Sequence, residues 1–91
     1  MNNSKYIVVK INGYEVIIVF PSLVTHVQIG NNFNEVISAG FVGIRTNKNI
    51  DGYREAGGDC YGESVSLGLK SRVKEDTILL NKMFELGDYK Y

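Results

Sequence analysis

The sequence has few of the residues that most often carry chemistry. Its 91 residues include one cysteine, Cys60, one histidine, His26, one proline and no tryptophan. A single cysteine excludes a disulfide within the chain. Closed zinc sites need four ligands, and these two side chains supply at most two of them. We therefore expect neither a metal site nor a cofactor.

Net charge and long apolar runs are lacking as well. Ten basic residues balance ten acidic ones, so no overall field draws the protein to nucleic acid or to an anionic membrane. The longest apolar runs fall far short of the roughly 20 residues that cross a bilayer. The first residues, MNNSKYIVVK, do not have the pattern of a signal peptide. We expect a cytoplasmic protein that binds neither membranes nor nucleic acid.

Length and composition are typical of one small globular domain. Hydrophobic residues make up 44% of the chain and charged residues 22%, and both values are ordinary for a folded protein. We expect residues 1–91 to form a single α+β domain. It should have an antiparallel sheet of about four strands, made of an N-terminal β-hairpin and two further strands, with a C-terminal helix packed on one face.

The hairpin is the strongest local pattern. Asn12 and Gly13 tolerate the positive φ angles of a type I′ turn and lie between two apolar runs. With a two-residue loop, Ile11 faces Tyr14, and directly opposed residues share a face of the sheet. The predicted core face carries Ile7, Val9, Ile11, Tyr14, Val16, Ile18 and Phe20.

The other face of the hairpin is also apolar, which is unusual for a sheet with one wet face. It carries Tyr6, Val8, Ile17 and Val19. One helix covers only one face, so the second needs cover from the 23–34 segment or from another chain. A bare apolar face in a small protein favours association. We therefore predict a homo-oligomer with this second face as its interface.

Weaker patterns place the remaining elements. Residues 23–29 could form a short helix, and residues 35–46 favour a strand interrupted by the small residues Ser38, Ala39 and Gly40, which suggest a bulge or a close backbone approach. Residues 47–58 predict an exposed loop. Residues 61–69 alternate between large residues and glycine or serine, which predicts a strand.

The last element is predicted to be a helix. Ser71 is a plausible N-cap, and Glu75 and Asp76 in the first turn complement the helix dipole. An apolar stripe at helical spacing follows. It contains Val73, Leu79, Leu80, Met83, Phe84 and Leu86.

Three catalytic or metal-binding patterns are incomplete. Cys60 and His26 could act as nucleophile and base only if they came within hydrogen-bond reach. Residues 62–66 begin like the hydrolase elbow G-x-S-x-G but end in Ser66. Residues 47–58 imitate half of a calcium loop and lack its final glutamate. We therefore assign no catalytic residue, and a partly buried, inert thiol is the simpler interpretation of Cys60.

A polar cluster is the best candidate for a ligand site. Arginine and tyrosine side chains can hold a phosphorylated or planar ligand through forked hydrogen bonds and stacking. Serine hydroxyls on a strand with small side chains would let such a ligand approach. The cluster could equally be an ordinary solvated loop. The candidate ligand-binding residues are Arg45, Arg54, Asp59, Tyr61, Ser64 and Ser66.

The segments VISAGFVGI (36–44) and YGESVSLGLKSRVKEDTILLN (61–81) resemble small proteins of tailed phages and prophages with no established activity. The resemblance implies a bacterial host and a compact, often oligomeric protein that acts by binding, including proteins that counter host defence. It implies no catalytic residues. We therefore expect a non-enzymatic binding protein for a protein partner or small ligand. The alternative is a small-ligand or nucleotide-binding module, or an enzyme, using the polar cluster.

Overall fold

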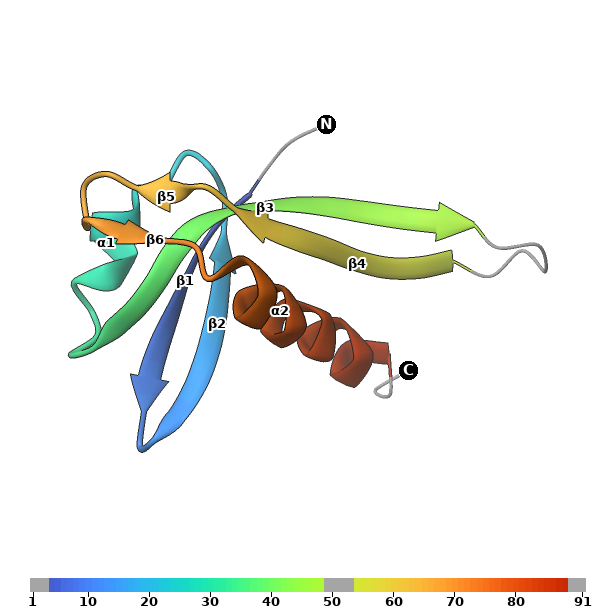
Figure 1. Cartoon of the computed structure of the whole chain (residues 1–91), viewed down its shortest axis with the longest axis horizontal. Coiled ribbons are helices and arrows are strands. Elements are labelled where there is room, and N and C mark those ends of the chain that lie inside the picture. The colour runs from blue at the N-terminus through green and yellow to red at the C-terminus, as the bar shows by residue number, and fades with distance from the viewer. Residues whose placement is uncertain (1–3, 49–53, 89–91) are drawn as a thin grey trace.

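A computed structural model describes the backbone of residues 4–48 and 54–88 and the side chains of residues 4–43 and 57–83. Its sheet has four antiparallel strands in the order β2-β1-β3-β4 (Figure 1). The elements are β1 (Ser4–Ile11), β2 (Tyr14–Phe20), α1 (His26–Gly30), β3 (Val36–Lys48), β4 (Arg54–Tyr61), β5 (Glu63–Ser64), β6 (Leu69–Lys70) and α2 (Val73–Asp88). The predicted α+β class, with its hairpin, two further strands and C-terminal helix, is confirmed.

The hairpin register is also as predicted. Ile11 pairs with Tyr14, and the ladder continues from there to Tyr6 opposite Val19. Asn12 and Gly13 have φ angles of 51° and 84°, the left-handed region that a type I′ turn requires. Two local residues therefore fix the pairing of β1 with β2.

The small residues of β3 mark both a bulge and a close approach, as predicted. Val8 pairs with Ser38 but Val9 pairs with Val36, so Ile37 is an extra residue in β3. A Cβ atom on Gly40 would lie 2.4 Å from the carbonyl oxygen of Tyr61. Only glycine fits at this position.

The main core lies between the sheet and α2. It includes the hairpin face that was predicted to be an interface between chains, and that prediction is wrong because α2 of the same chain covers the face. Tyr6 and Val8 are fully buried there, and Ile17 is 8% exposed. The cluster consists of Tyr6, Val8, Ile17, Val42, Cys60 and Leu80, with Val19, Ile37 and Leu79 packed against it.

A second core lies on the opposite face of the sheet, where the 23–34 segment supplies the cover. Ile7, Val9, Phe20 and Ala39 are buried there. Residues of α1, its flanking loops, β3 and the β5–β6 hairpin complete it: Val24, Ile29, Phe33, Val36, Leu67 and Leu69. The predicted core face is only partly correct, because its residues nearest the turn, Ile11, Tyr14 and Val16, are exposed.

Two sequence-based boundaries are wrong beyond β3. The predicted loop 47–58 overlaps two strands, since β3 runs to Lys48 and β4 begins at Arg54. The predicted strand 61–69 is the end of β4 followed by a short hairpin of β5 and β6. Gly62 and Gly68 have φ angles of 78° and 67°, and these left-handed residues break the extended chain. The outer parts of β3 and β4 extend beyond the rest of the molecule as a two-stranded ribbon (Figure 1).

Helix α2 begins at Val73, two residues after Ser71, so Ser71 is not its N-cap. Glu75 and Asp76 do lie in the first turn. The short helix α1 has a true capping box, in which the Thr25 side chain accepts from the backbone of Gln28 and the Gln28 side chain accepts from Thr25 N–H. In the part of the chain that the structure describes, no helix is long and apolar enough to cross a membrane.

Candidate functional site

The predicted polar cluster does not form one group. The β3–β4 register pairs Arg45 with Gly57 and Lys48 with Arg54, three rungs apart. Alternate rungs belong to opposite faces of a ribbon, so Arg45 and Arg54 occupy positions on different faces. Their side chains lie outside the described residues. Asp59 shares a face with Arg45 and is exposed.

Tyr61 belongs to an aromatic row rather than to a charged cluster. Its ring stacks on Phe41, with 5.9 Å between ring centroids, and 39% of the residue is exposed. Phe41 in turn meets the edge of His26, whose ring meets Phe20. The row continues from the second core to the surface, where the Tyr61 ring could stack with a planar ligand.

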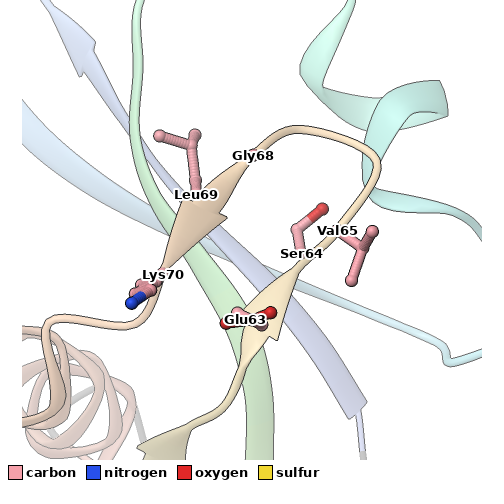
Figure 2. A pocket seen from close by; sticks show the side chains of 6 residues that line it. All are labelled: Glu63, Ser64, Val65, Gly68, Leu69 and Lys70. Atoms are coloured by element: carbon pink, nitrogen blue, oxygen red, sulfur yellow. The ribbon is translucent and has the colours of Figure 1, made fainter.

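Ser64 ends β5, and Ser66 lies in the turn of the β5–β6 hairpin. Ser64 is 3% exposed, and its hydroxyl accepts a hydrogen bond from Leu67 N–H at 3.2 Å and lies 3.3 Å from Ser66 Oγ. The concave side of this hairpin encloses about 240 Å³. Figure 2 shows that the lining residues come from both strands and the turn: Glu63, Ser64, Val65, Gly68, Leu69 and Lys70. Turn contacts already engage the Ser64 hydroxyl, so the charged groups in the lining are those of Glu63 and Lys70.

Cys60 and His26 lie on opposite faces of the sheet and cannot form a dyad. Cys60 is 1% exposed in the core beneath α2, where burial and the Asp76 carboxylate raise the pKa of its thiol to about 11. His26 is buried between two phenylalanine rings on the other side, and its Nε2–H donates to Gly40 O at 2.8 Å. Both residues are structural in this arrangement.

A buried polar network joins β1 to the start of α2. The Tyr6 hydroxyl lies 2.6 Å from Asp76 Oδ2 and 2.7 Å from Ser71 Oγ. Asp76 has no exposed surface and also accepts from Arg72, through the backbone N–H at 3.0 Å and the guanidinium at 2.8 Å. Burial and the neighbouring carboxylate raise the pKa of the Tyr6 phenol above its ordinary value. The network anchors the start of α2 to β1, because the Tyr6 hydroxyl and the Asp76 carboxylate are hydrogen-bonded to each other and to neighbouring groups.

This network reaches the surface through Arg72. Its guanidinium forms an ion pair with Glu15 of β2 at 2.9 Å, and it holds the pKa of that carboxyl below its ordinary value. The sequence contains a signal for the network that composition alone does not reveal. Asp76 lies three residues after Val73 and four before Leu80, within the apolar stripe of the helix, and a charged residue there predicts a buried partner.

A group of exposed apolar residues lies at the free end of the β1–β2 hairpin. Tyr14 is 75% exposed, Ile11 42% and Val16 40%, and the strand register places all three on one face. Beside them a pocket of about 310 Å³ opens between the hairpin turn and the loop that follows α1. It is lined by Lys10, Ile11, Asn12, Asn32, Phe33 and Asn34. We call Ile11, Tyr14 and this pocket the hairpin-end patch.

Comparison of the chain with protein-family models, curated proteins and solved structures finds no match. Function is therefore inferred from the geometry of the chain itself.

Proposed function

We propose that this chain is a non-enzymatic binding protein that acts as an oligomer and contacts a protein partner through the hairpin-end patch. The single observation that carries the proposal is the exposure of Tyr14 and Ile11 beside a pocket. Exposed aromatic and aliphatic residues around a hollow are typical of a protein-binding surface, because such anchors gain most when a partner removes them from water.

The disposition of the reactive side chains supports the same proposal. Cys60, His26, Tyr6 and Asp76 are all buried and tied to neighbouring groups. A buried, protonated thiol is a poor nucleophile. Those four side chains serve the fold, and the exposed apolar residues are left for recognition. From the resemblance of residues 36–44 and 61–81 to phage proteins, we further propose that this binding occurs in a bacterial host, with a host protein as the partner, including a component of host defence.

Affinity capture from a bacterial lysate tests this proposal. Wild type and the control Val65→Ala, whose side chain is exposed in the β5–β6 turn, should retain the same host protein. Ile11→Ala combined with Tyr14→Ala should lose it while the far-UV circular dichroism spectrum stays unchanged. Retention of the same host protein by the double variant would overturn the assignment to the hairpin-end patch.

A small-ligand module is the second candidate, and the exposed Tyr61 ring stacked on Phe41 favours it. A planar ligand such as a nucleotide base would stack on that ring. A thermal-shift screen with nucleotides and cyclic nucleotides separates the two candidates, because a ligand that binds the native state raises the unfolding temperature. The second candidate requires a shift that Tyr61→Ala removes and Tyr14→Ala preserves.

A further inference from the structure

We infer that the free edge of β2 is a self-association surface and that its occupant is the β2 strand of a second copy of this chain. This inference rests on the proposed function, because it names the contact that makes the binding protein an oligomer. It also replaces the covered hairpin face as the route to assembly: the copies join edge to edge.

The main chain of β2 leaves three residues unpaired at this edge. In a two-residue hairpin the residues that close the turn, Ile11 and Tyr14, exchange both hydrogen bonds, and alternate residues of each strand then point outward. The bond from Lys10 N–H to Glu35 O confirms this alternation on β1. The outward residues of β2 are Glu15, Ile17 and Val19. No residue in the described ranges pairs with their backbone groups, since β1 is the only strand beside β2.

The composition of β2 favours strand pairing. Six of the seven residues of YEVIIVF are apolar, and the strand has no lysine, proline or register shift against β1. Those are the devices that commonly protect an edge strand from another chain. Pro21 follows directly and ends the pairing segment. The one charged residue of the edge, Glu15, is paired with Arg72 of the same chain, and an otherwise apolar edge of this length is expected to accept a strand.

On the opposite edge of the sheet, α2 occupies part of the outward main chain of β4. Where α2 crosses β4, Asn81 bonds both the N–H and the C=O of Gly58, and the Thr77 hydroxyl accepts from Cys60 N–H. A β2-to-β4 contact between copies would be head-to-tail and would extend into a filament. Because these β4 groups are occupied, β2-to-β2 pairing about a two-fold axis is favoured over pairing of β2 with this part of β4.

A two-fold axis at Ile17 gives an antiparallel register in which all seven residues pair. Ile17 then faces its own copy, Glu15 faces Val19, and the outward main-chain groups meet as hydrogen-bonded pairs. The two glutamates are not opposed, so no like charges meet across the axis. On the other face Val16 lies opposite Ile18 and Tyr14 opposite Phe20. The register covers exposed Val16 with an aliphatic side chain.

Light scattering coupled to size exclusion tests the inference with the full chain. Wild type at micromolar concentration should have the mass of a dimer. Glu15→Pro removes an outward donor without affecting the β1–β2 ladder, so it should give a monomer. Glu15→Ala loses the same ion pair to Arg72 but keeps the donor, and it should remain a dimer. Val16→Lys, which places a charge beside the axis, should also dissociate it, whereas Leu23→Lys, at another exposed apolar position, should not.

A monomeric wild type would overturn the inference, as would a Glu15→Pro protein that remains dimeric. Folding of each variant is checked by circular dichroism, and Val16→Lys supplies the answer if Glu15→Pro does not fold. The outcome is separable from lysate capture by the hairpin-end patch. A monomeric wild type that still captures its partner through Tyr14 would end the self-association inference and leave the binding function intact. A dimeric wild type that captures no host protein would support self-association and contradict the proposed binding function.

Discussion

Asn81 of α2 bonds reciprocally with the backbone of Gly58 on β4. Its Oδ1 accepts from Gly58 N–H at 3.2 Å, and its Nδ2 donates to Gly58 O at 3.2 Å. A neighbouring strand would make the same two bonds, so one carboxamide takes the place of a fifth strand at this point. Nδ2 also donates to Thr77 O at 2.9 Å within the helix. The helix thus closes an edge that hydrophobic packing alone would leave with unpaired polar groups.

Replacing Asn81 should destabilise the fold mainly through the loss of its hydrogen bonds. In Asn81→Ala both Gly58 groups lose their partners in a partly buried site, and each unsatisfied group typically costs about 1–3 kcal/mol. Urea denaturation should show a lower midpoint. The neighbouring Lys82→Ala, at an exposed position, should change the free energy of unfolding by no more than about 0.5 kcal/mol. Equal effects of the two substitutions would contradict this role for Asn81.

Gly58 itself should tolerate no side chain. A Cβ there would lie 2.9 Å from both Gly43 O and Leu80 Cδ2, so Gly58→Ala should cost about 1–3 kcal/mol through overpacking. Gly43→Ala is the matched control in the paired strand, since its Cβ would meet only the Tyr61 ring at 3.7 Å. Thermal unfolding should separate the two variants, and a Gly58→Ala protein as stable as Gly43→Ala would disprove the close packing of α2 on β4.

Tyr6→Phe should destabilise the protein although it preserves the ring. It removes the hydroxyl that contacts the fully buried Asp76, and losing a hydrogen bond to a charged group costs roughly 1.5–3 kcal/mol. Tyr14→Phe, on the exposed end of the hairpin, is the control and should be neutral in the same denaturation experiment. A neutral Tyr6→Phe would mean that the network does not hold α2.

Alkaline pH should lower stability through Cys60. The thiol is neutral in the folded protein, with its pKa raised from 9.0 to about 11, so the unfolded state releases a proton first. The contribution of the neutral thiol to the free energy of unfolding is complete below pH 9 and is lost as the pH rises from 9 toward 11. We expect the free energy of unfolding to fall across that window more steeply in wild type than in Cys60→Ser. Identical slopes would contradict the raised pKa.

The sequence predicted what depends on neighbouring residues. Asn12 and Gly13 specify the hairpin register, because a type I′ turn admits one pairing. The alternation of side chains along a strand also correctly assigned Tyr6 and Val8 to the same face of the sheet. It could not say what covers that face, since helix docking depends on contacts between residues some 70 positions apart, as with Tyr6 and Asp76. The missing cover was therefore ascribed to another chain.

The errors beyond residue 60 have a local cause. Alternation of serine and glycine with larger residues is typical of a strand, but Gly62 and Gly68 adopt left-handed conformations instead, and glycine does so at almost no cost. The candidate ligand site failed as one cluster for a related reason. Arg45 and Arg54 are both arginines and lie close in sequence. Only the β3–β4 register shows that their positions in the ribbon belong to opposite faces.

The most direct test of edge-to-edge assembly is amide hydrogen exchange of β2 followed by NMR. At concentrations where the chain is assembled, the amides of Glu15, Ile17 and Val19 should be protected, and dilution should release them. The amides of Val16 and Ile18, which pair with β1 in the same chain, should stay protected throughout. Rapid exchange at Ile17 under all conditions would contradict the account, because it would leave the β2 edge open to water.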